Sequence, residues 1–285
     1  MNFFNLLSKY KSNRQSNNRY IKSSIPATKF KHVYLVIGIK GGVGKSTISY
    51  AIASGLSLKH KTAIIDCDIE SSNLKDFMNL SNSNMSSNIN FSTMGAIKIN
   101  NNLYASGMSV FDSDYINKSI YTNASQLRQF INDFILYTRY GSLESDYCII
   151  DVPAGSSDIM MAIIESFKRI NQTIDGVIVV TQPNTITDFN RALDLSSKLG
   201  LEVLYVVINM HKAVSKHAHP VICSCGCGEE FIPFNNMYDK MLSNISNSGI
   251  DITDIYDIPL MENANINHIA IYLSDLIDSL STRGV

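Results

Sequence analysis

The 285-residue chain lacks several features that mark whole classes of protein. No apolar run reaches about 18 residues, the length that a transmembrane helix needs, so we expect no membrane-spanning segment and a soluble protein. We recognise no secretory signal peptide and no repeat of solenoid length. Five cysteines are an odd number, which argues against a framework of disulfides and for a reducing compartment. We therefore expect a cytoplasmic protein, with a mitochondrial-type organelle as the alternative.

Acidic residues are absent from the first 31 positions, which carry seven lysines and arginines. The remaining positions hold 17 basic and 25 acidic side chains, although the net charge of the whole chain is −1. We predict that residues 1–30 form a basic, flexible arm outside the fold and that residues 31–285 form one domain. The alternatives for the arm are a weak contact with a membrane or nucleic acid and a transit peptide. No stable binding to nucleic acid or membrane is expected.

Strand-like and helix-like segments alternate after the arm, which predicts an α/β fold with a mostly parallel sheet and helices on both faces. The strands are expected at residues 33–37, 62–66, 103–105, 147–151, 176–181, 202–208 and 255–258. The helices are expected at residues 47–57, 125–137, 157–169, 186–198, 235–245 and 265–280. Residues 81–102 are rich in asparagine and serine and predict an irregular surface excursion. Sheets of this kind bind ligands at the carboxyl ends of their strands.

A glycine-rich loop follows the first predicted strand and has the sequence Lys40-Gly41-Gly42-Val43-Gly44-Lys45-Ser46-Thr47. Consecutive glycines let backbone N–H groups converge on one point, and the helix that begins at Ser46 adds the positive end of its dipole. Lys45 is placed to span the β- and γ-phosphates of a nucleotide, and the Ser46 hydroxyl to ligate Mg²⁺. Ile39 replaces the first glycine of the strict phosphate-loop pattern, so the motifs downstream carry part of the argument. The loop predicts nucleotide binding.

Acidic and amide side chains follow three further predicted strands. Asp66 and Asp68 end the second strand, where one carboxylate is suited to the water shell of Mg²⁺ and the other to orienting an attacking water. Asp151 follows an apolar strand and is positioned to hold Mg²⁺, while the Pro-Gly loop after it is suited to sensing a γ-phosphate. Asn209 ends the sixth strand, and no Asn-Lys-x-Asp guanine signature begins there. ATP is therefore favoured over GTP.

Together these motifs resemble the deviant Walker A ATPases of the MinD/ParA type and, within them, the Mrp-like iron–sulfur cluster carriers. The resemblance covers residues 31–281 and identifies residues 31–285 as a MinD/Mrp-like P-loop ATPase domain that binds ATP and Mg²⁺. It implies that the signature lysine, Lys40, reaches across a homodimer to the partner's nucleotide and that Asn209 lies near the adenine. The catalytic positions it implies are Lys40, Lys45, Asp68 and Asp151. The nucleotide-binding positions it implies are Gly41, Gly42, Val43, Gly44, Lys45, Ser46, Thr47, Asp66 and Asn209, with Ser46 also on the metal.

A cysteine-rich loop occupies residues 211–234. Its three cysteines alternate with other residues and are Cys223, Cys225 and Cys227. In an extended segment alternate side chains share a face, so these thiols are able to converge on one soft metal ion or cluster. Three histidines precede or accompany them, and we expect these to be ordinary surface residues: His211, His217 and His219. The other cysteines, Cys67 and Cys148, lie in apolar runs and are expected in the core.

The Mrp-like carriers hold a [4Fe–4S] cluster between two subunits with one Cys-x-x-Cys pair from each, whereas this chain has Cys-x-Cys-x-Cys. The resemblance implies that Cys223 or Cys225, together with Cys227, supplies two thiolates per subunit. A closed tetrahedral zinc site of cysteine and histidine within one subunit is the alternative. The function implied is an ATP-hydrolysing carrier that binds a cluster at the dimer interface and delivers it to apo iron–sulfur proteins. The rival functions are a positioning ATPase acting on DNA or a membrane, and an ATPase that inserts nickel or zinc.

Overall fold

The structure, a computed structural model, describes residues 28–68, 77, 96–107, 131, 135–136, 140, 144–215, 220–222, 227, 229–230, 235–250, 254–261 and 266–282. Its strands are β1 (Lys29–Ile37), β2 (Thr62–Asp66), β3 (Ile97–Lys98), β4 (Leu103–Gly107), β5 (Glu144–Asp151), β6 (Gly176–Thr181), β7 (Val203–Val214) and β8 (Ile255–Met261). Its helices are α2 (Lys45–Leu56), α6 (Ser157–Arg169), α7 (Ile186–Lys198), α8 (Asn235–Asn247), α9 (Ile266–Tyr272) and α10 (Ser274–Thr282).

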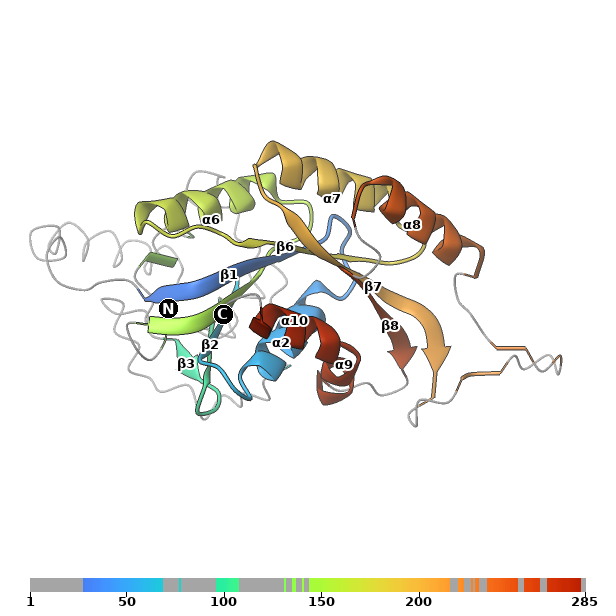
Figure 1. The fold of residues 1–285 in the computed structure, drawn as a ribbon, viewed down its shortest axis with the longest axis horizontal. Helices are drawn as coiled ribbons and strands as arrows, with labels where there is room; N and C mark the ends of the chain where they lie inside the picture. Colours follow the sequence, from blue (N-terminus) through green and yellow to red (C-terminus); the bar gives the residue numbers. More distant parts are fainter. Residues whose placement is uncertain are drawn as a thin grey trace, which may run out of the picture.

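The strands form one eight-stranded sheet in the order β3-β4-β2-β5-β1-β6-β7-β8. Every neighbouring pair is parallel except β3 and β4, which are antiparallel. Helices α6, α7 and α8 cover one face of the sheet, and α2, α9 and α10 cover the other (Figure 1). The predicted α/β fold, with a mostly parallel sheet between two helical layers, is confirmed.

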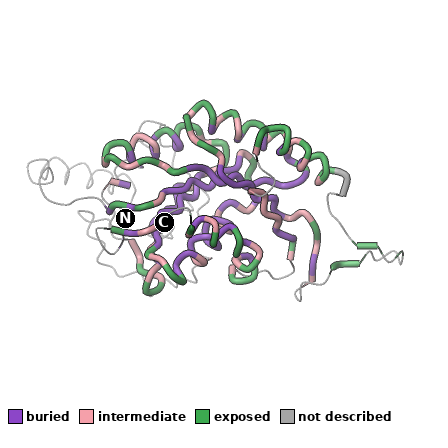
Figure 2. Tube along the Cα trace, in the orientation of Figure 1, coloured by how far each residue is buried: buried purple, intermediate pink, exposed green. Residues whose placement is uncertain are grey.

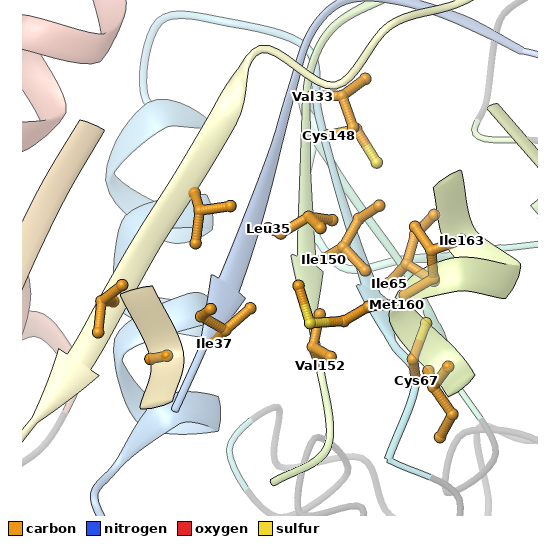
Figure 3. Close-up of a cluster of buried hydrophobic side chains, with 14 of the residues drawn as sticks. Val33, Leu35, Ile37, Ile65, Cys67, Cys148, Ile150, Val152, Met160 and Ile163 are labelled. Atoms are coloured by element: carbon orange, nitrogen blue, oxygen red, sulfur yellow. The ribbon is translucent and has the colours of Figure 1, made fainter. Parts of the chain in front are cut away.

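Successive residues of the central strands belong to two different cores. On β5, Cys148 and Ile150 pack with α6 and α7, whereas Tyr147 and Ile149 pack with α2 and the C-terminal helices. Figure 3 shows part of the first core, where Met160 of α6 lies beside the sheet. Burial on both faces explains why the strands are apolar without interruption, since neither face meets water (Figure 2). Cys67 and Cys148, predicted as core residues, are both buried.

Helix α6 illustrates how the outer layer attaches. Its apolar side chains recur at helical spacing and are buried, among them Ile159, Ile163 and Phe167. Asp158 lies in its first turn, and Lys168 and Arg169 in its last turn, so charges at both ends complement the helix dipole. One apolar stripe and two charged ends are sufficient to dock this helix against the sheet.

The structure differs from the predicted elements in several places. Strand β7 continues to Val214 instead of ending at residue 208, because β8 also pairs with Asn209, Ala213 and Val214. The single helix expected at 265–280 is broken at Leu273 into α9 and α10. Strand β3 lies inside the excursion predicted at 81–102 and adds an antiparallel edge to β4. Strand β1 begins at Lys29, inside the predicted arm, because Phe30 is buried.

Two other expectations fall mainly outside the described residues. The first is the basic arm, of which residues 1–27 lie outside the described residues. Of the helix expected at 125–137, residues 131, 135 and 136 are described, and all three are helical. Within the described part of the chain, every helix is too short or too polar to traverse a lipid bilayer.

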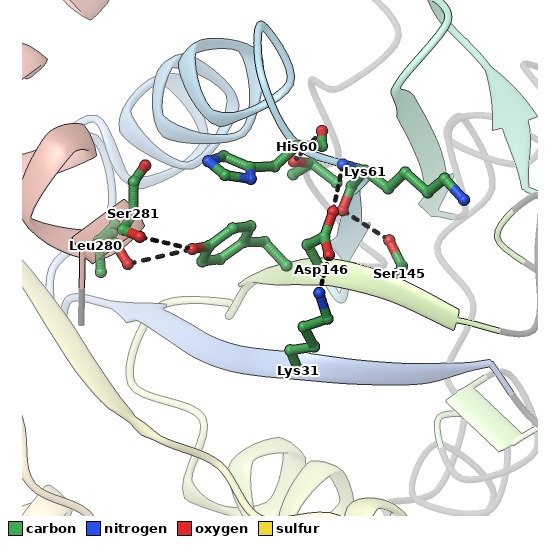
Figure 4. Close-up of polar contacts among 9 residues, drawn as sticks. Lys31, His60, Lys61, Ser145, Asp146, Leu280 and Ser281 are labelled. Carbon is green, nitrogen blue, oxygen red and sulfur yellow. Dashed lines mark hydrogen bonds and ion pairs between the residues drawn. The ribbon is translucent and has the colours of Figure 1, made fainter. Parts of the chain in front are cut away.

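Polar contacts join the elements at the amino-terminal end of the sheet (Figure 4). Lys31 Nζ on β1 lies 2.8 Å from Asp146 Oδ1 on β5. The same carboxylate accepts a hydrogen bond of 2.9 Å from the backbone N–H of Lys61, which precedes β2. The Tyr147 hydroxyl lies 3.4 Å from two carbonyl oxygens in the last turn of α10. These contacts place α10 and the start of β2 against β5, at the edge opposite to the predicted ligand site.

We predict that Phe167→Ala lowers the free energy of unfolding by about 3–5 kcal/mol, because it leaves a cavity between α6 and the sheet. Phe167 is 1% exposed, and its ring centroid lies 6.4 Å from that of Phe30. The matched control is Met161→Ala, which removes an exposed apolar side chain from the same helix and should change stability by about 0.5 kcal/mol or less. Denaturant titration of both variants measures the difference, and equal losses would contradict this packing.

Candidate functional site

The phosphate loop, residues 40–47, leads from β1 into the first turn of α2, and two of its glycines form the bend. Gly42 (φ 77°) and Gly44 (φ 96°) adopt left-handed conformations that residues with a Cβ atom rarely adopt. Gly44 is also the N-cap of α2, and no side chain in the described part of the chain caps this helix end. The first N–H groups of α2 are therefore directed at the loop and available to an anion.

Asn209 supports the loop from β7. Its side chain is buried, and its Nδ2 donates a hydrogen bond of 2.9 Å to the carbonyl oxygen of Val43. A Cβ atom on Gly44 would lie 2.3 Å from Asn209 Nδ2, so any larger residue at position 44 would displace this amide. The resemblance implied a place near the adenine for Asn209, and the structure adds a contact with the loop backbone that the sequence did not predict.

Three carboxylates lie at the carboxyl ends of β2 and β5. Asp66 and Asp151 are neighbours in the register of these two strands, and both side chains are buried. Asp66 Oδ1 accepts a hydrogen bond of 2.8 Å from the backbone N–H of Asp68, so it shapes the turn that leads to Asp68. Asp68 itself is half-buried. The predicted acidic residues thus gather where the strands end.

Asp151 and Lys45 carry opposite charges, and both side chains are buried. Burial raises the pKa of Asp151 to about 6, against the opposing influence of the nearby Ser46 hydroxyl and of the positive charge of Lys45. Burial also lowers the pKa of Lys45, against the negative charges of Asp151 and Asp68. Each charge is unfavourable by itself and is partly compensated by the other. The structure therefore brings together four predicted residues: Lys45, Ser46, Asp68 and Asp151.

The two oxygens of the Asp151 carboxylate have different surroundings among the described residues. Its Oδ1 accepts a hydrogen bond of 3.3 Å from Ser49, whereas its Oδ2 is buried and has no hydrogen-bond partner among the described residues. A buried carboxylate oxygen normally has a donor or a cation beside it. Carboxylate and hydroxyl oxygens are ligands that Mg²⁺ prefers, and Ser46 supplies the hydroxyl. The residues present therefore fit a magnesium ion.

The loop has a buried half and an exposed half. Val43 and Lys45 are 1% and 8% exposed, and Ser46 and Thr47 are half-buried. Lys40, Gly41 and Gly42 are exposed at the outer part of the loop. Lys40 is thus not part of the cluster around Asp151 within this chain, and its side chain is accessible from outside.

The segment after Asp151 lies beside the phosphate loop. The backbone N–H of Val152 donates to the Val36 carbonyl over 3.1 Å, which carries the chain past the end of β1. Gly155 is left-handed (φ 64°), and a Cβ atom there would lie 3.5 Å from the carbonyl oxygen of Ile39. The predicted Pro-Gly loop is therefore adjacent to the start of the phosphate loop.

Sequence reasoning missed two sets of residues at this edge. Ser49 contacts Asp151 from α2, and the signal available was a serine on an otherwise apolar helix face. Gln182 and Thr185 follow β6, where Thr185 hydrogen-bonds the backbone of Gln182, and Gln182 Nε2 lies 3.0 Å from the sulfur of Met210. Both are buried polar residues, and nothing in their local pattern distinguishes them from an ordinary turn.

Beyond Asn209, β7 leads into the cysteine arm, residues 215–234. Val214 forms an antiparallel bridge with Pro220, and Ile222 forms another with Glu230. The second bridge encloses positions 223–229, which hold all three cysteines of the arm. Cys227 is exposed and lies in a turn, while Cys223 and Cys225 lie outside the described residues. The antiparallel bridges therefore place Cys227 beyond the end of a strand that begins in the sheet.

The sequence predicted that His211 is an ordinary surface residue, but the structure places it in a partly covered position. It belongs to β7, is half-buried, and its ring centroid lies 5.3 Å from that of Tyr238 on α8. Burial lowers the pKa of His211, against the negative charge of Asp257 on β8. The expectation was wrong because a polar extension of β7 is covered by α8, a tertiary contact without a local signal. His217 and His219 lie outside the described residues.

A glycine loop between a central strand and its helix, faced by a buried carboxylate from the next strand, is the arrangement that binds nucleoside triphosphates in P-loop proteins. The fold and this site define the chain as a P-loop NTPase. The family model described as the NUBPL iron-transfer P-loop NTPase, of the ParA group, matches residues 29–246. The chain belongs to this family, and the resemblance inferred from its motifs is confirmed.

Relatives with assigned names support the same membership. The iron–sulfur cluster carrier protein of Rickettsia prowazekii is 30% identical over 236 residues, which cover 81% of this chain and 69% of the relative. The carrier of the same name from Rickettsia typhi is 32% identical over 183 residues, or 63% of this chain, and the match spans 54% of that relative's length. A solved nucleotide-binding protein of Archaeoglobus fulgidus in complex with ADP shares the fold, with 21% identity, a TM-score of 0.59 and 87% of each chain covered.

We predict that Asp151→Asn makes the protein without nucleotide more stable at neutral pH. The fold raises the pKa of this acid from 3.8 to about 6, so the folded protein favours the protonated form. The stability associated with that form is present at low pH and is lost as the pH rises through this interval. In EDTA, the variant should match the wild type at about pH 4 and exceed it by up to about 3 kcal/mol at about pH 8.

Urea titration at the two pH values measures this difference. Magnesium with a nucleotide should stabilise the wild type more than the variant, because a neutral amide replaces the carboxylate that is suited to the ion. A variant that is less stable than the wild type at the higher pH would contradict the assigned cost of this buried charge.

Proposed function

We propose that this chain is an ATPase that binds an iron–sulfur cluster and delivers it to apo-proteins. The observation that carries the proposal is the combination of a phosphate loop with three closely spaced cysteines enclosed by the bridge between Ile222 and Glu230. Membership of an iron-transfer family and relatives named as cluster carriers support it. The cytoplasm or another reducing compartment suits a protein whose clustered thiols must stay reduced.

In the proposed reaction the loop amides from Gly41 to Thr47 cradle the phosphates of ATP, and Lys45 lies against the β- and γ-phosphates. Ser46 and Asp151 would hold Mg²⁺, which would neutralise charge on the phosphates. Asp68, which is half-buried at the edge of the site, orients the attacking water. Asp66 and Asn209 keep the neighbouring backbone in position through the hydrogen bonds described above.

The cluster is the cargo of this cycle. We assign its ligands to Cys227 and to either Cys223 or Cys225, so that two chains provide four thiolates for one [4Fe–4S] cluster. A two-fold axis then brings the same patch of both chains together. Lys40 is exposed at the rim of the phosphate loop, where it is accessible to a partner's nucleotide. ATP binding draws the two chains together through Lys40, and hydrolysis loosens them.

We predict that anaerobic reconstitution with iron and sulfide gives an absorption band typical of [4Fe–4S] and a native mass of two chains with one cluster. Cys227→Ala should lose the cluster, as should one of Cys223→Ala and Cys225→Ala. The matched controls are Cys67→Ala and Cys148→Ala, which remove buried thiols away from the cysteine arm. Both control variants should keep the cluster.

Two outcomes would contradict this proposal. Full cluster loading in all three cysteine variants would show that these cysteines are not the cluster ligands. A colourless monomer that contains zinc or nickel would instead favour a metal site within one chain or a metal-inserting ATPase.

We predict that Lys40→Ala abolishes dimer formation driven by a slowly hydrolysed ATP analogue while leaving nucleotide binding within about threefold of the wild type, because Lys40 lies outside the buried cluster. The matched control is Lys98→Ala, which removes another exposed lysine from the edge strand β3. Analytical ultracentrifugation with and without the analogue measures the dimer. Unchanged dimerisation of Lys40→Ala would exclude a role across the interface.

A further inference from the structure

A single strand, β7, runs from the phosphate loop to the cysteine arm. Within six residues it contributes Asn209, which hydrogen-bonds the loop; His211, which packs on α8; and Val214, which forms the first bridge of the arm. The nucleotide site and the proposed cluster ligands are therefore joined by one short length of backbone.

Asn209 contacts the loop at a peptide group that matters for phosphate binding. The Val43 carbonyl and the Gly44 N–H belong to the same planar peptide unit and point in opposite directions. The bond from Asn209 Nδ2 to the Val43 oxygen, 2.9 Å long, therefore sets the direction of the Gly44 N–H. Gly44 is the N-cap of α2, so this N–H lies where the loop meets the helix. A phosphate that reorients the Gly44 N–H must also move the Val43 carbonyl, and Asn209 with it.

The next residues of β7 are irregular. Met210 has a φ of 61°, a left-handed conformation that is uncommon for a residue other than glycine. The pairing of β7 with β8 shifts register between Asn209 and Ala213. Residues 210–212 are thus released from the regular ladder, although both flanks are paired. Such an irregularity lets a strand adopt more than one local arrangement and re-aims the side chains within it.

His211, Tyr238 and Asp257 hold this irregular segment. The two rings lie 5.3 Å apart, and the Tyr238 hydroxyl donates a hydrogen bond to Asp257. Two atoms of this cluster, His211 Nδ1 and Asp257 Oδ1, are buried and have no hydrogen-bond partner among the residues that the structure describes. Unpaired buried polar atoms raise the energy of the present arrangement, so a rearrangement that pairs them is favoured.

We propose that residues 209–214 of β7 transmit the nucleotide state of the phosphate loop to the cysteine arm, with His211, Tyr238 and Asp257 as positioning residues. The inference rests on the proposed function only in that nucleotide binding and cluster binding occur on the same chain. A change at the Val43–Gly44 peptide moves Asn209, the irregular segment adjusts against α8 and β8, and the bridge between Val214 and Pro220 carries the shift into the arm.

The experiment uses the full chain without an iron–sulfur cluster, so it does not depend on cluster binding. Cys227 is exposed and therefore open to alkylation. Peptide mass spectrometry measures the rate of its alkylation with and without magnesium and a slowly hydrolysed ATP analogue. In the wild type we expect the analogue to change the alkylation rate by about fivefold, the lower end of ordinary allosteric coupling. In His211→Phe and Tyr238→Phe, which keep both rings but remove the polar atoms, the change should fall below about twofold.

The matched control is Tyr104→Phe, on β4 at the other side of the sheet, which should respond as the wild type does. Nucleotide affinity of both test variants should stay within about threefold of the wild type, a result that loss of folding would not give. If the analogue binds but the alkylation rate of the wild type does not change, or if both variants keep the full change, the inference is overturned. If the analogue does not bind to the wild type, the proposed function fails first.

Discussion

Burial of the central strands on both faces is the constraint from which the site follows. Strands β1, β5 and β6 lie between two helical layers, so the polar residues that belong to them are confined to the strand ends. Parallel pairing then places those ends along one edge, where Asp66 and Asp151 become neighbours and the phosphate loop begins. The site is a consequence of how a parallel sheet hides its backbone and side chains from water.

The same burial gives the site its electrostatic character. Lys45 and Asp151 are held in a region of low polarity, where each would be more stable without its charge, and one Asp151 oxygen has no partner among the described residues. The chain thus keeps two buried charges that a nucleotide with magnesium would pair. Without the nucleotide these charges lower the stability of the fold. Unfavourable charges retained at a binding edge are a recurring sign of function in otherwise well-packed proteins.

Strand β7 joins this electrostatic centre to the part of the chain that carries soft ligands. In the sheet it is apolar, whereas beyond Asn209 it becomes more polar, shifts register against β8 and contacts α8. The strand therefore serves two purposes in one element: its first half completes the sheet, and its second half carries the cysteine arm. Both the loop contact of Asn209 and the half-burial of His211 follow from this change along one strand.

Most of the architecture was determined by local sequence, because apolar runs, glycines and polar strand ends each act over a few residues. The α/β alternation, the phosphate loop and the acids at residues 66, 68 and 151 were all predicted from such patterns. Tertiary structure alone decided the contacts between distant segments. Asn209 meets Val43 across 166 positions, β8 extends a polar stretch of β7, and α8 covers His211. Such contacts depend on which elements the fold brings together, and no local pattern encodes that choice.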